Sequence, residues 1–222
     1  MARPRSDIAP RIVHAARARF LTEGVDGASL RTIAADAGTS IGMIYYYFPT
    51  KDDLFLAVVE ETYGKLLHQL EAIFDRPTVP ARERLRDAFA HIGSASDEEI
   101  EVVRLIVREA LVSSTRLDRI VERFQRGHLP MVLRTLADGF ERGEIDPSIP
   151  LPFALMCTAG LGFVPQIMRR IAGNHMPVVA GLPEGPAFTD ALITMLFRAI
   201  GPRAAADQSV MESLSISSRK TP

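Results

Sequence analysis

Apolar side chains recur at helical spacing along the chain, and no stretch alternates with the two-residue period of a strand between hairpin turns. The sequence therefore predicts an all-α protein. Near the N-terminus the pattern predicts a helix over about 10–22, with Ile12 on its apolar face and Gly24 placed to end it. Ser29 is placed to cap a second helix, which Gly38 ends.

A short third helix and a long fourth helix follow directly. Ser40 is placed to cap the third helix, and Pro49 ends it after about two turns. Thr50 then caps a fourth helix from Lys51 to about Phe74. Further along, the spacing predicts helices over about 81–93, 97–113, 116–143, 152–171 and 186–200. We expect Pro130 to bend the helix over 116–143.

The composition is that of a folded protein, and its charges are unevenly distributed along the chain. The chain has 222 residues, of which 47% are hydrophobic, which is enough for a sizeable core. The net charge is −1, but residues 1–51 carry seven basic and four acidic side chains, a balance of +3. The remainder therefore carries −4, so a basic N-terminal part precedes an acidic body.

Two features bear on the compartment of the protein. The single cysteine, Cys157, excludes a disulfide or a cysteine-based zinc site within one chain, and the charged N-terminus lacks the apolar core of a signal peptide. We therefore expect a cytoplasmic protein. Leu151 to Met168 reaches the lower length of a membrane span, but it contains Pro152 and Pro165. We expect this run to be a buried helix and expect no membrane partner.

Enzymatic and metal-binding motifs are missing from the sequence. The five histidines are scattered without an HExxH pair, and there is no G-x-S-x-G motif or phosphate-binding glycine loop. We therefore expect no catalytic residues, no metal and no cofactor. Cys157 lies in an apolar run, where a structural thiol is favoured over a redox sensor.

The segment IGMIYYYF, residues 41–48, has too much aromatic surface for one buried stripe. Ile44 and Phe48 lie four residues apart and form the buried side of the third helix. Consecutive helical residues are separated by about 100°, so the three tyrosines fan over roughly 200° and at least one faces outward. The side opposite Ile44 carries Gly42, Met43, Tyr46 and Tyr47. Such a surface suits contact with DNA, whereas the alternative is that the tyrosines pack against the fourth helix.

Residues from about Ala9 to Leu54 resemble the DNA-binding head of the TetR/AcrR family of bacterial transcriptional regulators. The matching positions are Ile12, Ala15, Ala16, Phe20, Gly24, Ser29, Leu30, Ile33, Ala34, Ala37, Gly38, Thr39, Ser40, Gly42, Tyr45, Tyr46, Phe48, Pro49, Lys51 and Leu54. The resemblance implies a helix-turn-helix domain over 8–67, with the motif at about 29–48, and a ligand-binding and dimerisation domain over 68–202. Residues 203–222 are expected to be a mobile tail.

The resemblance also implies how the head contacts a double-stranded DNA operator. The residues nearest the base edges would be Thr39, Ser40, Ile41, Gly42 and Tyr46. Phosphates would be held by Ser29, Arg31, Met43, Tyr45, Tyr47 and Lys51. Ile41 and Tyr47 depart from the common family pattern, and Ile41 also fits the core period with Ile44 and Phe48. The third helix has no Lys or Arg, so its readout would rest on apolar, hydroxyl and shape contacts.

The body is expected to bind a small molecule and to form a homodimer. Candidate ligand-binding residues among the central helices are Phe89, Arg108, Phe124, Met131, Met156 and Phe163, although such apolar residues are also ordinary core positions. Small residues in 152–171 and an apolar stripe in 186–200 fit a four-helix interface between two chains. Two identical heads would read a palindromic operator.

The sequence thus predicts a ligand-responsive transcriptional repressor that a hydrophobic small molecule releases from its operator, where it would be associated with the bacterial nucleoid. The alternative is a helical dimeric module that binds a small molecule or a protein without sequence-specific DNA binding.

Overall fold

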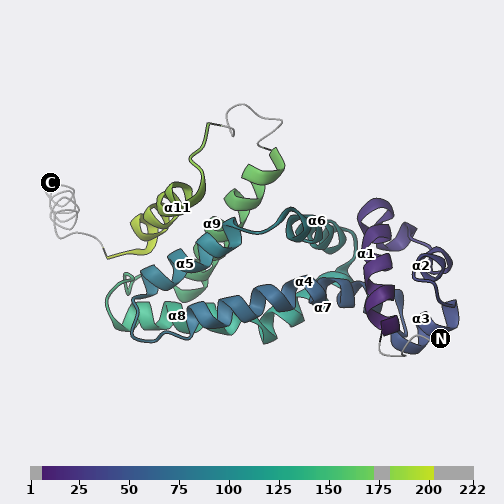
Figure 1. Ribbon diagram of the computed structural model, residues 1–222. Coiled ribbons are helices and arrows are strands. Elements are labelled where there is room, and N and C mark those ends of the chain that lie inside the picture. The colour runs from purple at the N-terminus through teal and green to yellow at the C-terminus, as the bar shows by residue number, and fades with distance from the viewer. Residues whose placement is uncertain (1–6, 173–180, 203–222) are drawn as a thin grey trace, which may run out of the picture. The chain divides into compact units, whose positions relative to one another are not determined.

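The computed structural model describes residues 7–172 and 181–202, and every regular element in these residues is an α-helix, as predicted. The helices, labelled in Figure 1 where there is room, are α1 (Ile8–Gly27), α2 (Leu30–Asp36), α3 (Ile41–Tyr47), α4 (Lys51–Phe74), α5 (Ala81–Gly93), α6 (Asp97–Val112), α7 (Ser114–Arg126), α8 (His128–Glu141), α9 (Leu151–Ala172) and α11 (Gly185–Ile200). The predicted tail over 203–222 lies outside the described residues.

The chain forms two compact units. The first joins Met1–Ala72 to Ala95–Pro130, and the second joins Ile73–Ser94 to Met131–Pro222. Helices α6 and α7 therefore belong to the same unit as the N-terminal helices. The functional division into residues 8–67 and 68–202 remains a prediction, because compact packing and functional roles need not have the same boundaries.

One continuous hydrophobic core fills the first unit. Helix α1 contacts α2, α3 and α6, and α2 contacts α3. The core includes the fully buried side chains Ile12, Phe20, Ile33, Ile44, Leu54 and Phe55. Leu105 of α6 and Ile120 of α7 belong to the same cluster. The N-terminal helices thus share their core with α6 and α7, so the burial that stabilises the head depends on both helices.

Most predicted helix boundaries are confirmed because local caps set them. Helices α4 and α5 have the predicted bounds. Thr50 Oγ1 accepts a hydrogen bond from Asp53 N at 3.0 Å, and the Asp53 carboxylate accepts from Thr50 N at 2.9 Å. This reciprocal pair caps the N-terminus of α4. Gly24 breaks α1 as expected, with φ 78° and ψ 165°, but the chain then makes one more turn to Gly27.

The predicted bend at Pro130 is wrong. The run over 116–143 is two helices, α7 and α8, and they separate at Gly127, whose φ and ψ are −106° and −117°. Pro130 lies in the first turn of α8, where a missing backbone N–H removes no helical hydrogen bond. Gly127 is required because a Cβ there would overlap the Tyr63 hydroxyl.

The break at Gly24 leaves backbone groups that α6 satisfies. Val25 N–H has lost the Leu21 carbonyl as its helical partner, and it donates instead to Glu109 Oε1 at 3.2 Å. Arg108 Nη1 donates to the Leu21 carbonyl at 3.4 Å, and its Nη2 donates to the Phe20 carbonyl. At the other end of α6, the buried Arg17 of α1 pairs with Glu98 and donates to the Glu98 carbonyl at 3.2 Å. Hydrogen bonds and an ion pair therefore hold both ends of α6 against α1.

Arg116 joins four segments of the first unit. Its side chain is 6% exposed, and it pairs with Glu109 of α6 at 2.7 Å and with Asp52 of α4 at 2.9 Å. It also pairs with Asp26, in the last turn of α1. These hydrogen bonds raise the pKa of Arg116 and lower the pKa of Asp26, so both groups stay charged. Each of the three carboxylates thus has a cationic partner, and the pair of Arg116 with Glu109 is the buried part of the cluster.

The second unit is built around α5, α9 and α11, which contact one another. Phe89 of α5 packs against Gly162 of α9, where a Cβ would overlap its ring. Helix α9 is long and apolar enough to cross a membrane by length and composition, since Leu151–Arg170 has a mean hydropathy of 1.5. Only 28% of its most apolar window is buried, so the expected buried helix is only partly covered within one chain.

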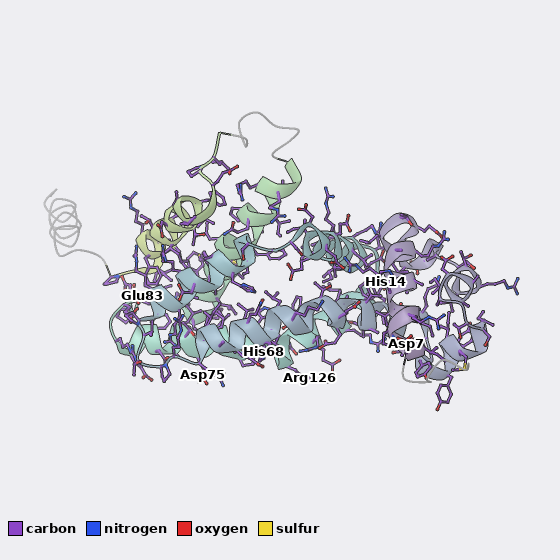
Figure 2. All side chains as sticks on the ribbon, in the orientation of Figure 1. Asp7, His14, His68, Asp75, Glu83 and Arg126 are labelled. Atoms are coloured by element: carbon purple, nitrogen blue, oxygen red, sulfur yellow. The ribbon has the colours of Figure 1, made fainter. Side chains whose placement is uncertain are left out.

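Loss of Arg116 should destabilise the first unit strongly. Arg116→Met leaves the buried Glu109 carboxylate without its closest cation, and we expect the free energy of unfolding in urea to fall by about 3 kcal/mol. The matched control is Arg126→Met in the same helix, because Arg126 is 71% exposed and, among the described residues, its ion pair is with Glu122 (Figure 2). The control should change stability by less than about 0.5 kcal/mol. Equal losses of unfolding free energy in the two variants would contradict the stabilising role of the buried Arg116.

A second polar contact joins α4 to the start of α8. The Tyr63 hydroxyl lies 2.8 Å from His128 Nδ1, and its oxygen accepts a hydrogen bond from the His128 backbone N–H at 3.1 Å. In the tautomer with its proton on Nε2, the imidazole accepts the hydroxyl proton at Nδ1. Burial lowers the pKa of His128, and the charge of Arg123 lowers it further.

Stability should therefore fall on mild acidification. A histidine whose folded-state pKa is lowered binds its proton less readily than in the unfolded chain, so stability falls as pH drops below the unfolded value of about 6.5. Urea unfolding of the wild type should show this fall between about pH 6.5 and 5. His128→Gln should flatten the profile in that window and leave the decline below about pH 4, where the paired carboxylates titrate. An unchanged pH dependence of stability in the variant would show that His128 does not cause the fall.

Candidate nucleic-acid interface

Helices α2 and α3 form a helix-turn-helix that side-chain caps define. The Ser29 hydroxyl accepts from Thr32 N at 3.5 Å at the start of α2, and the Ser40 hydroxyl accepts from Met43 N at 3.3 Å at the start of α3. Between them, Gly38 has φ 60°, a conformation that strongly favours glycine. The Thr39 N–H donates to the Ala34 carbonyl at 2.9 Å and closes the turn. The three predicted signals at Ser29, Gly38 and Ser40 are confirmed.

The outer face of α3 is aromatic and exposed. Ile44 is 1% exposed and packs in the core, whereas its neighbours Tyr45 and Tyr46 are 52% and 76% exposed. Ile41, which the sequence left between a core and a surface position, is 39% exposed. Tyr45 and Tyr46 are thus not buried against α4, and the outer face of α3 is exposed to solvent in the single chain.

Tyr47 supports the exposed ring of Tyr46. Tyr47 is half-buried, and its ring meets that of Tyr46 edge to face at a centroid distance of 5.1 Å. Its other neighbour is Phe48, whose ring centroid lies 6.3 Å away. Met43 is also half-buried. Tyr47 therefore links the aromatic surface of α3 to the side that packs on the core.

The protein itself does not require glycine at position 42. A Cβ there would meet only Ser40 Oγ, at an ordinary van der Waals distance of 3.7 Å, and Gly42 has no positive φ. Glycine within a helix costs about 0.5–1 kcal/mol relative to alanine. The small residue on this exposed face leaves room for something outside the chain to approach the α3 backbone.

The remaining predicted contact residues surround α3. Ser29, Arg31 and Ser40 are exposed, and Thr39 is half-buried. Lys51 Nζ donates to the Asp26 carbonyl at 3.0 Å, which leaves two of its three protons for an external acceptor. The structure therefore brings all eleven predicted DNA-contacting residues to the α2–α3 segment or its edges.

Acidic residues near this surface are neutralised within the chain. Hydrogen bonding to Arg19 lowers the pKa of Asp36, and hydrogen bonding to Arg119 lowers the pKa of Asp53. Both carboxylates are ionised and paired, with distances of 2.7 Å to Arg19 and 2.6 Å to Arg119. Their partners reduce the repulsion that these charges exert on an approaching phosphate.

The six predicted ligand-binding residues do not form one described pocket. In the first unit, Phe124 stacks near Tyr63 and His128 at centroid distances of 5.3 and 5.0 Å, while Arg108 is bonded to α1 carbonyls. In the second unit, Phe89 is buried and Met131 is half-buried. Met156 and Phe163 of α9 are 64% and 36% exposed, so they line no enclosed cavity in the single chain.

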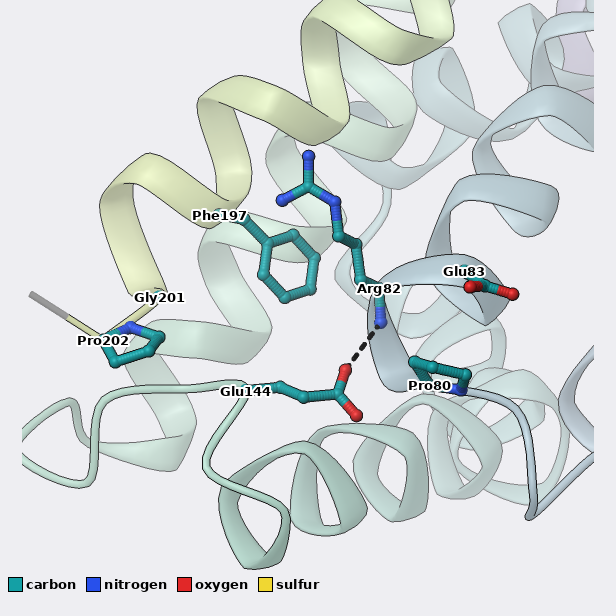
Figure 3. A pocket seen from close by; sticks show the side chains of 7 residues that line it. All are labelled: Pro80, Arg82, Glu83, Glu144, Phe197, Gly201 and Pro202. Carbon is teal, nitrogen blue, oxygen red and sulfur yellow. Dashed lines mark hydrogen bonds between the residues drawn. The ribbon is translucent and has the colours of Figure 1, made fainter. Parts of the chain in front are cut away.

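Open grooves occur elsewhere in each unit. The groove in Figure 3, about 480 Å³, lies between the start of α5, the turn at Glu144 and the end of α11, where Arg82 stacks over the Phe197 ring at 5.0 Å. Another, about 510 Å³, follows α1 and the end of α2 and includes Arg11 and Asp36. Neither groove contains any of the six predicted ligand-binding residues.

No metal-binding cluster of His, Cys, Asp and Glu is found within residues 7–172 and 181–202. His14 lies on α1 and His68 on α4 (Figure 2), and the side chain of His68 is 89% exposed.

Sequence reasoning missed the charged residues that hold the head together. Arg11 of α1 donates to the carbonyls of Ala37 and Gly38 at the end of α2, the latter at 3.2 Å. The buried Arg17 and Arg116 each bond residues more than 60 positions away. No local spacing marks these residues, because their partners are distant in the sequence.

Comparisons with known proteins agree with this geometry. The profile of the family described as "Bacterial regulatory proteins, tetR family" matches residues 12–58, which include α2 and α3. The chain is 31% identical to the HTH-type transcriptional repressor SCO4008 of Streptomyces coelicolor over 184 residues, 78% of this chain and 88% of that protein. It is 32% identical to the HTH-type transcriptional repressor NicS of Pseudomonas putida over 169 residues, 75% of this chain and 79% of that protein.

The fold also matches a solved structure over most of its length. The transcriptional regulator FadR of Bacillus subtilis, in complex with stearoyl-CoA, superposes with a TM-score of 0.67 at 20% identity. The match covers 85% of this chain and 97% of that one.

Proposed function

The chain belongs to the tetR family of bacterial regulatory proteins, and from this premise we propose that it is a ligand-responsive transcriptional repressor. It binds a palindromic DNA operator as a homodimer and leaves it when a hydrophobic small molecule binds. The observation that carries this proposal is the exposed aromatic face of α3, where Tyr45 and Tyr46 are 52% and 76% exposed beside the buried Ile44.

Helix α3 enters the major groove and reads bases without a charged side chain. The residues nearest base edges are Thr39, Ser40, Ile41, Gly42 and Tyr46. Apolar and aromatic side chains contact thymine methyl groups, and hydroxyl groups bond base edges. Because α3 contains neither Lys nor Arg, the bidentate contact of arginine with guanine does not contribute.

Phosphate contacts flank this readout and supply affinity. We assign them to Ser29, Arg31, Met43, Tyr45, Tyr47 and Lys51, with Arg31 and Lys51 as the cations. Lys51 keeps two donor protons beyond its bond to the Asp26 carbonyl. Phosphate contacts fix the register of the head on the duplex, while the face of α3 discriminates sequence.

The homodimer forms through α9 and α11. Helix α9 exposes an apolar stripe at helical spacing that includes Phe153, Met156, Phe163 and Val164. Helix α11 adds Met195, which is 56% exposed, whereas Phe188 and Leu192 of the same helix are buried in the protomer. A large apolar surface on a soluble protein marks an interaction site, and a two-fold axis pairs the same helices of each chain.

A hydrophobic effector controls the spacing of the two heads. The B. subtilis regulator with this fold binds stearoyl-CoA, an amphipathic molecule with a long apolar chain. We place the effector in the ligand-binding and dimerisation domain over 68–202. An effector that favours the spacing incompatible with DNA weakens operator binding by its differential affinity for the two states.

The path from body to head runs through α6 and α7. These helices are bonded to α1 by Arg17 and Arg108 and to α4 by Arg116. A displacement of α6 or α7 therefore moves α1 and the head with it. The protein acts in the cytoplasm as a regulator rather than an enzyme, and it is associated with the nucleoid when bound to DNA.

Selection of bound duplexes from a random library tests DNA recognition. We expect one palindrome with half-sites about one helical turn, or a multiple of it, apart. Tyr46→Ala should weaken binding to that palindrome by about tenfold or more, because it removes a base contact from the exposed face. Gly42→Ala should stabilise the chain slightly, by about 0.5 kcal/mol, yet weaken operator binding.

Two outcomes would contradict the proposal. Selection without any enriched palindrome would favour the alternative, a helical dimer without sequence-specific binding. Full operator affinity in both variants would show that α3 does not face the bases.

Substitution on α9 tests the dimer. Met156→Glu places a charge on the exposed apolar stripe, and we expect mainly monomer by sedimentation at about 10 μM, with at least tenfold weaker operator binding. Leu111→Glu is the matched control, because Leu111 of α6 is 84% exposed and lies outside the proposed interface. A dimer in the Met156 variant, or a monomer in the Leu111 variant, would move the interface elsewhere.

A further inference from the structure

The C-terminal end of α2 is held by an arginine of another helix. Arg11 Nη2 donates to the Ala37 carbonyl and, at 3.2 Å, to the Gly38 carbonyl. These carbonyls lie at the end of α2, where the helix no longer supplies N–H partners. A guanidinium suits this position because it is planar, permanently charged and attracted to the negative end of a helix.

Gly38 is shaped to admit this arginine. Its φ of 60° favours glycine, and a Cβ at this position would lie 2.6 Å from Arg11 Nη2. Glycine therefore satisfies both the backbone turn and the approach of the guanidinium. A second arginine of α1 acts nearby, since Arg19 Nε pairs with Asp36 Oδ2 at 2.7 Å. Helix α1 thus contacts the last residue of α2 and the turn after it.

The place of this contact in the chain gives it a consequence for α3. Only Thr39 and Ser40 separate Gly38 from the first residue of α3. The carbonyls that Arg11 holds therefore fix the origin and direction of α3 relative to α1. Helix α3 has seven residues and packs on the core through Ile44, Tyr47 and the adjoining Phe48, so the turn that Arg11 holds adds a polar constraint at its start.

The surroundings of Arg11 argue against a direct contact with DNA. Arg11 is half-buried, and the groove that it lines also contains Asp36 and Glu61. Asp36 is paired with Arg19, so Glu61 is the carboxylate of this groove that disfavours an approaching phosphate. Both hydrogen bonds described for Arg11 also go to the α2–α3 turn rather than outward.

We propose that Arg11 is the positioning residue of the recognition helix: it sets the orientation of α3, and hence sequence discrimination, without touching DNA. This inference rests on the proposed operator binding. It distinguishes Arg11 from Arg31 and Lys51, which act on phosphates and contribute to binding of any duplex.

Arg11→Met keeps the aliphatic stem and removes the donors. We expect affinity for the selected palindrome to fall about tenfold, while affinity for a random duplex of equal length and the salt dependence of binding stay unchanged. Arg11→Lys, with a single cationic donor group, should lose less. Arg104→Met, at an exposed position on α6, is the matched control and should behave as wild type.

Two results would overturn the assignment. A salt slope reduced by about one for both duplexes would show a phosphate contact. An unchanged ratio of palindrome to random-duplex affinity, even with a lower unfolding temperature, would reduce Arg11 to a purely structural residue.

The assignment can also be tested without DNA. In proton–nitrogen correlation spectra of the free protein, Arg11→Met should shift the amide resonances of Thr39, Ser40 and Ile41 and speed their hydrogen exchange, while Arg104→Met should not. Unchanged amides in the Arg11 variant would refute the positioning role. If the wild type selects no palindrome but the amides shift, the proposed function fails while the contact of Arg11 with the turn stands.

Discussion

The buried contact between Arg116 and Glu109 is the interaction on which the first unit depends. Their side chains are 6% and 4% exposed, and removing either one weakens the pairing of the other at a depth where a poorly paired charge is costly. Around this pair, Asp26 ties the end of α1, Asp52 ties the start of α4, and Val25 N–H caps the Glu109 carboxylate. The geometry of the head is therefore set by charges that α6 and α7 supply.

These charges and the shared core make the helix-turn-helix part of one compact unit with α6 and α7. Helix α1 lies at its centre: it contacts α6 through Arg17 and the Gly24 break, and it contacts the α2–α3 turn through Arg11. The outer face of α3 is thus connected to α6 by a short series of bonds through one helix.

The sequence predicted what local chemistry decides. Ser29, Ser40 and Thr50 cap their helices as expected, and Gly38 ends α2, because a cap depends on residues within one turn. Helical geometry also placed Gly42 and Tyr46 correctly on the exposed side of α3, whereas Met43 and Tyr47, expected on the same side, are half-buried. The partners of Arg11 and Arg17, and the Asp26 and Asp52 partners of Arg116, could not be predicted, since they lie 26 to 90 positions away. The bend predicted at Pro130 was wrong because a proline fits the first turn of a helix as well as it fits a bend. The helices separate at Gly127 instead, where the Tyr63 hydroxyl leaves no room for a Cβ.

The shared core of α1 to α4 with α6 and α7 has a consequence for protein engineering. A fragment cut after residue 67 would lose Leu105 and Ile120 from its core and the partners of Val25 and Asp26. The DNA-binding head therefore cannot be moved to another protein as an independent domain. A chimera that carries this operator specificity to another sensor body must also bring residues 95–130.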